Sequence, residues 1–208
     1  MSYRSESVCT TCRRENLKLF LKGDRCFTEK CSFERRSYPP GQHGQARTKF
    51  SEYSLQMREK QKVRKLFGLL ENQFENVVSK ATIQRGVTGE AMLASLERRL
   101  DSVVYSLGFA QSRSQARQLV RHSHFLVNQK RLNIPSYQVN AGDVIEVHEK
   151  SRVLKPILAA LEAIKRREIP QWLDLNAGQF KGMVKQAPKR ADITMPIQEN
   201  LIVEYYSR

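Results

Sequence analysis

The chain has 208 residues, of which 40% are hydrophobic, so it can bury one sizeable core or two small ones. Its 36 lysines and arginines oppose 21 acidic residues, which gives a net charge of +15 and a pI near 9.9. We find no run of about 18 apolar residues and no secretion signal, so this charge favours a nucleic acid over a membrane as the partner, and we expect a cytoplasmic protein.

Four cysteines lie in two close pairs near the beginning of the chain. Cys9 and Cys12 are separated by two residues, and Cys26 and Cys31 by four. This spacing lets four thiolates surround one tetrahedral zinc ion, and four thiolates leave no position open for water, so we predict a structural rather than a catalytic site. An iron–sulfur cluster is the alternative, whereas disulfides would require an oxidising compartment.

The metal would order an arm over residues 1–50 that has little core of its own. The end of this arm, residues 38–44, is rich in proline and glycine, which excludes regular structure there. Exposed cations in such a segment can follow a nucleic-acid backbone. The candidate RNA-binding residues of the arm are Arg35, Arg36, His43, Arg47 and Lys49.

Three helices are predicted next from an apolar spacing of three and four residues, over 51–66, 71–81 and 89–107. In the first of them, Arg58, Lys62 and Lys65 form a basic row at i, i+4 and i+7. This row is a second candidate for RNA contact. Glu59 lies close enough on the same surface to be an ordinary ion-pair partner instead.

A short helix over residues 112–121 carries the clearest binding pattern. Arg113, Arg117 and Arg121 fall in one row, and apolar residues occupy a neighbouring face. Ser112 and Gln115 match a capping box, which marks the beginning of the helix. No acidic residue lies between Ser112 and Arg121 to pair with the arginines, so we predict that the row contacts RNA phosphate.

After this helix the apolar period changes from 3.6 toward 2, which predicts short antiparallel strands at 125–127, 131–132 and 144–147. The weaker RNA-binding candidates beside the arginine helix are Ser123, His124, Asn128, Lys130 and Arg131. A further helix is predicted over 154–166, and weak strand patterns follow at 179–184 and 201–206.

These elements predict an α+β fold: a helical domain, a small α/β RNA-binding module with a short antiparallel sheet, and a metal-ordered N-terminal arm. We expect the arm over 1–50, the helical domain over 51–98, the module over 99–169, and a segment over 170–208 that packs on the helical domain. Basic residues exceed acidic ones in every fifty-residue stretch, which suits the broad footprint of a folded RNA better than a short DNA motif.

Several motifs, taken together and in order, resemble the S4 family of bacterial small-subunit ribosomal proteins. The resemblance covers essentially the whole chain and includes its metal-binding, four-cysteine branch. The motifs lie at Cys9 to Cys31, 35–44, 58–62, 100–105, 116–120 and 202–208.

The resemblance implies a structural protein, not an enzyme, that binds small-subunit rRNA early and nucleates assembly of the subunit body. It further implies a contribution to translational accuracy, contact with ribosomal protein S5, a place near the mRNA entry channel and no small-molecule substrate. In the metal-binding branch the matching ligands are Cys9, Cys12, Cys26 and Cys31.

One departure from the family pattern concerns the turn after the arginine helix. The family pattern is Val-Asn-Gly-Arg, whereas residues 127–130 here are Val-Asn-Gln-Lys. Glycine most readily accepts a positive φ, so Gln129 would be strained by up to about 1 kcal/mol if it takes the left-handed conformation. The turn type is therefore left open by the sequence.

Two other functions compete with the ribosomal one. An RNA-modifying enzyme could carry the same module as an accessory, but no nucleotide-binding glycine-rich loop, recognisable carboxylate pair or open metal site is evident. A zinc-containing nucleic-acid-binding regulator would instead prefer duplex DNA.

Overall fold

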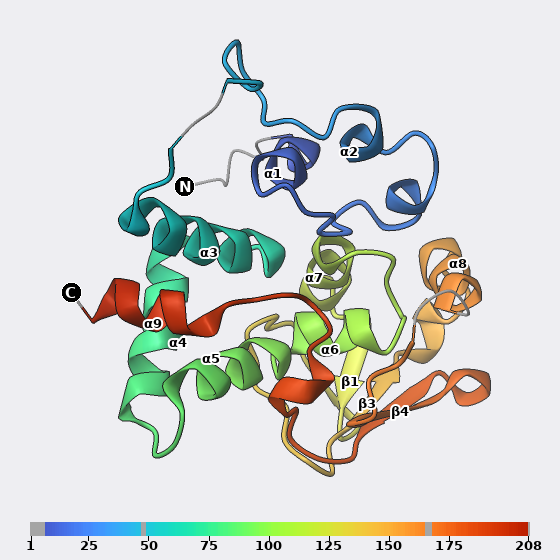
Figure 1. Ribbon diagram of the computed structural model, residues 1–208. Coiled ribbons are helices and arrows are strands. Elements are labelled where there is room, and N and C mark those ends of the chain that lie inside the picture. The colour runs from blue at the N-terminus through green and yellow to red at the C-terminus, as the bar shows by residue number, and fades with distance from the viewer. Residues whose placement is uncertain (1–6, 47–48, 165–167, 208) are drawn as a thin grey trace. The chain divides into compact units, whose positions relative to one another are not determined.

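The computed structural model describes residues 7–46, 49–164 and 168–207. The chain forms two compact units (Figure 1). Unit 1 comprises residues 1–89 and 196–208, and unit 2 comprises residues 90–195.

The arm of unit 1 contains only short helices. They are α1 (Val8–Arg14), the 3-10 helix η1 (Gly23–Phe27) and α2 (Ser32–Arg35). In the described part of the arm, the buried apolar side chains are three cysteines and Leu19, which is 2% exposed. The arm therefore has very little apolar core, as expected from its composition.

The rest of unit 1 consists of α3 (Glu52–Leu66), α4 (Glu71–Ile83) and α9 (Glu199–Tyr206). The hydroxyl of Ser51 accepts a hydrogen bond from the backbone N–H of Ser54 and so caps α3. Phe74 of α4 is fully buried, and its ring lies 6.3 Å from that of Tyr206 in α9. The first two helices were predicted within two residues at each end.

The expected strand at 201–206 is wrong, because these residues form helix α9. Its apolar run is too short for the period to decide between strand and helix. In the helix, Ile202 is fully buried and Tyr206, one turn later, reaches the carboxylate of Glu71 with its hydroxyl. Packing against α3 and α4 therefore selects the helix.

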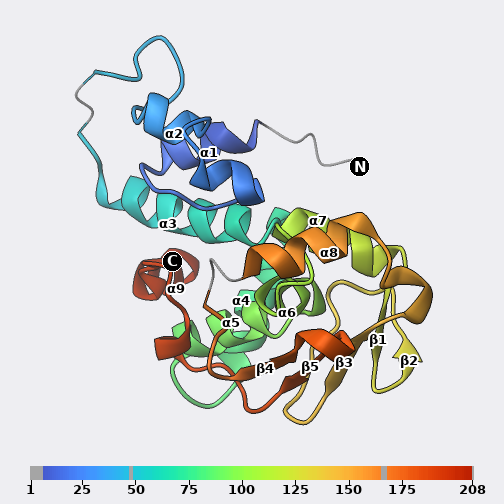
Figure 2. The ribbon, with the colours of Figure 1, turned by 90° about the vertical axis from the view of Figure 1, so that its right-hand side faces the viewer.

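Unit 2 contains a five-stranded antiparallel sheet with strand order β2-β1-β3-β5-β4 (Figure 2). The strands are β1 (Phe125–Val127), β2 (Lys130–Arg131), β3 (Val144–Val147), β4 (Leu173–Asn176) and β5 (Lys181–Val184). Register places Phe125 opposite Val147 and Ile145 opposite Gly182.

The helices of unit 2 lie mainly before the first strand. They are α5 (Thr88–Glu97), which spans the boundary of the units, α6 (Leu100–Ser106), α7 (Arg113–Arg121), and α8 (Lys155–Ala163) after β3. Three-residue 3-10 turns lie at Glu149–Ser151 (η2), Ala177–Gln179 (η4) and Arg190–Asp192 (η5).

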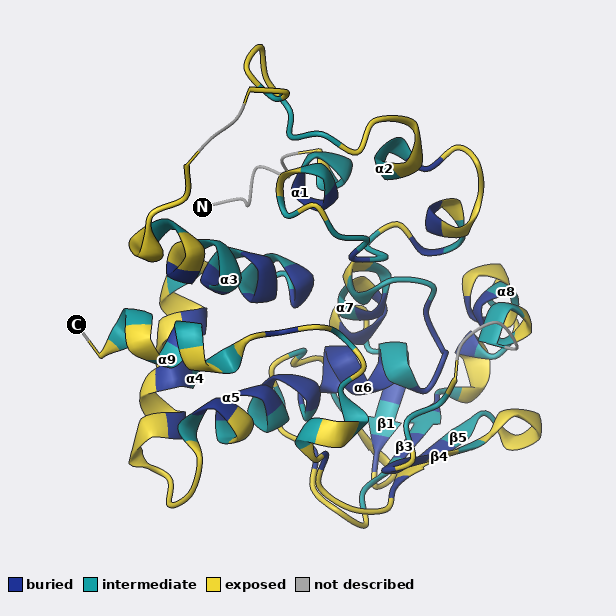
Figure 3. Ribbon diagram, viewed as in Figure 1, coloured by how far each residue is buried: buried dark blue, intermediate teal, exposed yellow. Residues whose placement is uncertain are grey.

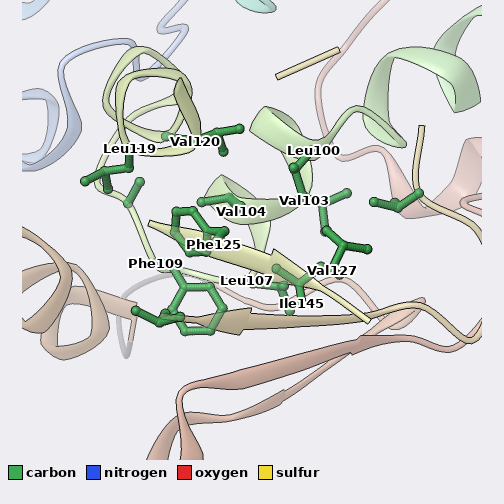
Figure 4. Close-up of a cluster of buried hydrophobic side chains, with 14 of the residues drawn as sticks. Leu100, Val103, Val104, Leu107, Phe109, Leu119, Val120, Phe125, Val127 and Ile145 are labelled. Atoms are coloured by element: carbon green, nitrogen blue, oxygen red, sulfur yellow. The ribbon is translucent and has the colours of Figure 1, made fainter. Parts of the chain in front are cut away.

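One hydrophobic core joins α6, α7 and α8 to the sheet (Figure 4). Val104 of α6, Leu107 directly after that helix and Val120 of α7 are fully buried in one cluster with Phe125 and Ile145 of the central strands. Helix α6 is buried along most of its length (Figure 3), so any polar side chain on it must find a partner inside the protein.

The single helix expected over 89–107 is interrupted between α5 and α6. Arg99 is extended, with ψ 138°, and forms an isolated bridge with Gln138. The backbone N–H groups of Leu100 and Asp101 donate to the carbonyls of Tyr137 and Pro135. This pairing satisfies the first donors of α6 and stabilises the break.

The expected packing of the whole segment 170–208 on the helical domain does not hold. Strands β4 and β5 extend the sheet of unit 2, and only residues 196–208 belong to unit 1. The edge of β3 supplies the physical reason, because it offers a ladder of backbone hydrogen bonds that β5 completes.

Candidate RNA-binding surface and cysteine cluster

Helix α7 begins where the sequence predicts, but its cap differs in one bond. The hydroxyl of Ser112 accepts from the N–H of Gln115 at 3.2 Å, as expected. The side chain of Gln115 reaches back to the N–H of Gln111 at 2.7 Å, one residue before the expected partner. Both side chains still satisfy backbone donors at the helix start.

Two arginines of the predicted row on α7 are engaged by acids inside unit 2. Arg117 donates to the carboxylate of Asp101 at 2.7 and 2.8 Å. Arg113 lies 3.2 Å from the carboxylate of Glu97 and 4.7 Å above the ring of Tyr105. No acidic residue lies between Ser112 and Arg121, but acids of α5 and α6, 16 residues earlier in each case, pair with these two arginines. Contact of the row with RNA stays a prediction.

Asp101 is the centre of this network. Its side chain is 4% exposed, and it accepts bidentate hydrogen bonds of 3.0 Å from Arg99 as well as those from Arg117. It also accepts from the backbone N–H of Ser102. A carboxylate with two arginines and a backbone donor can remain charged in the interior, and it ties α6 to α7.

Glu97 is in a less favourable environment. Burial raises the pKa of its carboxyl, and Arg113 only partly opposes that shift. Asp101 raises the same pKa slightly further through charge repulsion. Arg113 and Arg117 therefore form ion pairs within unit 2. An RNA phosphate would have to compete with the carboxylates of Glu97 and Asp101 for these arginines.

The remaining cations of this region are exposed. Arg121 at the end of α7, Lys130 and Arg131 of β2 all lie on the surface. Among the described residues neither Arg121 nor Lys130 forms an ion pair, and Arg131 contacts the imidazole of His148 at 3.0 Å. These three side chains are the best-placed candidates for phosphate contact in unit 2.

The turn between β1 and β2 holds two left-handed residues, Asn128 with φ 49° and Gln129 with φ 66°. Two positive φ values in a two-residue loop define a type I′ turn, so Gln129 does take the strained conformation. The amide of Asn128 donates to Asp143 at 2.8 Å and accepts from the N–H of Val144. Asn128 therefore fixes the hairpin.

The two remaining candidates beside α7 are half-buried. Ser123 terminates the helix in a left-handed conformation, with φ 60°. His124 lies 2.9 Å from the hydroxyl of Ser151 through its Nδ1 atom. Burial lowers the pKa of His124, and the neighbouring His122, Arg131 and His148 lower it further.

The basic row on α3 is also largely engaged within its own unit. Lys62 is 8% exposed and donates to Glu59 at 2.5 Å and to the carbonyl of Pro196 at 3.0 Å. Arg58 lies 3.5 Å from Glu15, whose pKa is raised by burial and lowered in turn by Arg58. Lys65 is half-buried and acts on the same carboxyl. Glu59 is thus the partner of Lys62, the alternative that the sequence raised.

Four of the five candidates in the arm are exposed, namely Arg35, Arg36, His43 and Lys49. Arg47 lies outside the described residues. Arg35 donates from Nε to the carbonyl of Glu29 at 3.2 Å. These positions are accessible to a nucleic acid, and their contact with RNA stays a prediction.

The four cysteines come together in the fold. Cys9, Cys12, Cys26 and Cys31 line one small pocket of the arm, and all four are free thiols. Burial raises the pKa of Cys12 and that of Cys26, and the neighbouring thiols raise both further. Over the described ranges, no group of three or more histidine, cysteine or acidic side chains is placed so that it could hold an ion, so the metal stays a prediction.

The sequence alone did not reveal the acids that pair with the arginines, nor that His148 lies beside His124. Glu97 and Asp101 lie one turn apart across the break between α5 and α6, a signal visible only once the break is known. His148 follows β3 directly, and the register of β1 and β3 would have placed it beside His124.

Across the described ranges, the helices are all too short or too polar to span a bilayer.

Comparison with known proteins gives matches along the chain. The model of the ribosomal protein S4/S9 N-terminal domain matches residues 4–97, and that of the S4 domain matches residues 98–145. Small ribosomal subunit protein uS4 of Desulfatibacillum aliphaticivorans is 60% identical over 202 residues, 97% of each chain. The proteins uS4 of Desulforapulum autotrophicum and uS4A of Bdellovibrio bacteriovorus are 59% and 58% identical over 208 residues, 100% of each chain.

Proposed function

The chain belongs to the uS4 family of small ribosomal subunit proteins, and from this membership we propose that it is a structural, non-enzymatic constituent of the small subunit that binds small-subunit rRNA. The carrying observation is the 59–60% identity to uS4 proteins over 97–100% of the chain. The protein accordingly works in the cytoplasm, as part of the ribosome.

The charge of the molecule supports this role. The net charge of +15 is spread over both units, and Arg121, Lys130 and Arg131 are exposed together with the cations of the arm. Each lysine or arginine that neutralises a phosphate releases counterions, which makes such binding strongly dependent on salt. A large folded RNA can engage many of these positions at once.

Competition between two nucleic acids tests the proposal. At fixed salt, a transcript of small-subunit rRNA should displace labelled rRNA from the protein at far lower concentration than duplex DNA of equal length. Footprinting on the same transcript should protect a compact set of nucleotides. Equal competition by DNA would favour the nucleic-acid-binding regulator and contradict the ribosomal role.

We further propose that the cysteines place the chain in the metal-binding branch of the family. Cys9, Cys12, Cys26 and Cys31 would hold one structural zinc ion, for which four thiolates are a common complete ligand set. Support comes from their paired spacing and their common pocket. The ion would offset the lack of apolar core in the arm, since zinc binding supplies on the order of 10 kcal/mol in small modules.

Removal of the metal tests this proposal on the full chain. A chelator should make the arm sensitive to protease while the fluorescence of Trp172, the single tryptophan and buried in unit 2, stays unchanged. Metal analysis should return one zinc per chain. Visible absorption typical of an iron–sulfur cluster would show that the cysteines hold such a cluster instead of zinc. An arm that resists protease after chelation would contradict a metal-dependent fold.

We also propose the finer family roles for this chain, namely early rRNA binding that nucleates assembly of the subunit body, a contribution to translational accuracy, contact with ribosomal protein S5 and proximity to mRNA. The support is the resemblance alone. Order-of-addition reconstitution tests the first of them, because omission of a nucleating protein should block the later proteins of the subunit body. Normal incorporation of those proteins would contradict it.

A further inference from the structure

Three of the four histidines of the chain lie in one area of unit 2, together with an arginine. We refer to His122, His124, His148 and Arg131 as the histidine cluster. His122 follows α7, His124 precedes β1, Arg131 lies in β2 and His148 follows β3. The histidines are thus brought together by the sheet rather than by one local sequence.

The backbone fixes the arrangement of the cluster. Phe125 is paired with Val147, and the N–H of His148 donates to the carbonyl of His124 at 2.9 Å. The ring of His122 lies 6.0 Å from that of His124. The hydroxyl of Ser151, which is 5% exposed, lies 2.9 Å from Nδ1 of His124 and orients its ring.

Arg131 contacts one histidine of the cluster directly. Its Nη2 atom lies 3.0 Å from Nε2 of His148. A guanidinium can only donate, so Nε2 of His148 is the acceptor in this contact. Protonation of His148 would turn that acceptor into a donor and bring two cations face to face.

Among the described residues, no acidic group is found to act on the imidazole of His124. Burial lowers the pKa of His124, and the neighbouring groups His122, Arg131 and His148 lower it further. The 3-10 helix after His148 contributes Glu149 and Lys150, which are both exposed and of opposite sign. A bound anion is the natural addition, because its oxygens would accept from the guanidinium and from protonated imidazoles at the same time.

We propose that the histidine cluster is a phosphate-binding site for the rRNA backbone, and that it takes up protons when the RNA binds. This inference rests on the proposed function and deepens it. Arg131 supplies the permanent charge. A phosphate beside the imidazoles would favour their protonated form.

The sign of the pH dependence follows from linkage. Bound RNA favours the charged imidazoles, so their pKa is higher in the complex than in the free protein. Affinity for RNA therefore rises as pH falls through the range below about 7, where free histidines begin to titrate. Uptake of one proton corresponds to a tenfold gain per pH unit, and partial uptake to proportionally less.

The test measures affinity for a transcript of small-subunit rRNA at pH 8, 7 and 6 and constant ionic strength. The wild-type chain should bind roughly tenfold more tightly at pH 6 than at pH 8. The triple variant His122→Gln, His124→Gln, His148→Gln should lose this dependence. Calorimetry in two buffers of different ionisation enthalpy should detect proton uptake by the wild-type chain alone.

His43 offers a matched control, since it is the one histidine outside the cluster and lies in unit 1. His43→Gln should keep the pH dependence, whatever it does to the affinity. Arg131→Gln should weaken binding at all three pH values. Trp172 fluorescence at each pH verifies that unit 2 of every variant is folded.

Two results would overturn the inference while the proposed function stands: wild-type binding that is tight but equal at pH 8 and 6, or a pH dependence that survives in the triple variant. Absence of specific rRNA binding at every pH would instead defeat the proposed function, and the inference with it.

Discussion

Unit 2 uses arginine in two opposite ways. Arg113 and Arg117 on α7 are paired with buried or nearly buried carboxylates. Arg121 at the end of the same helix and Arg131 in β2 remain exposed. The first pair connects α7 to α5 and α6. The second pair is available to a ligand. A row of like charges on one helix therefore does not by itself define a binding face.

The difference is largest for the buried acid at the centre of the network. Asp101→Asn would remove the buried carboxylate that Arg99 and Arg117 share and should cost about 3–5 kcal/mol of unfolding free energy. Urea unfolding followed by Trp172 fluorescence measures it. Asp174→Asn is the matched control, because Asp174 is 57% exposed and forms an exposed ion pair with Lys185, so little change is expected. Equal effects of the two changes would refute the structural role of the network.

The next effect separates the two kinds of arginine by function. Arg121→Gln should leave the unfolding free energy within about 0.5 kcal/mol and lower the salt slope of rRNA binding by about 0.9. Arg117→Gln should do the reverse, with a loss of about 1–3 kcal/mol in stability and an unchanged salt slope. Binding titrations from 50 to 200 mM salt decide. A lower slope for Arg117→Gln alone would show that phosphate displaces Asp101 from this arginine.

The smallest effect concerns the turn that presents Lys130 and Arg131. Gln129 has φ 66°, so Gln129→Gly should relieve backbone strain and stabilise unit 2 by up to about 0.5 kcal/mol, after allowance for the greater freedom of glycine in the unfolded chain. Chemical unfolding measures the gain. Gln138→Gly, at an extended position, is the control and should not stabilise. Unchanged rRNA affinity in Gln129→Gly would show that the charges, rather than the rigidity of the turn, determine binding.

Much of the fold was predictable because its local patterns are strong. Helices α3, α4 and α7 and strands β1 and β3 follow from apolar periodicity and caps. Helix α9 was missed because the apolar residues of 201–206 fit either period, and contact with α3 decides between them. The α+β class was correct despite that error.

The binding surface was harder to predict, for a physical reason. The partners of Arg113 and Arg117 come from residues 16 positions earlier, and no pattern within α7 reveals them. Cysteine spacing, by contrast, is a local signal. The four thiols line one pocket, and the ion that they would hold stays a prediction. Periodicity thus predicts which face of a helix is polar, but not what the polar face meets.

The two-part construction of unit 1 bears on how the protein is made. Helix α9, which completes the packing of α3 and α4, is encoded after the whole of unit 2. Synthesis adds about 5–20 residues per second, so the roughly one hundred residues of unit 2 take about 5–20 s to be made. This interval separates the synthesis of the two parts of unit 1. During that interval α3 lacks its contacts with α9, and Phe74 lacks the ring of Tyr206. Unit 2, by contrast, emerges as one uninterrupted segment. Unit 2 can therefore finish folding before α9 is made. Until then unit 1 is incomplete and accessible to chaperones.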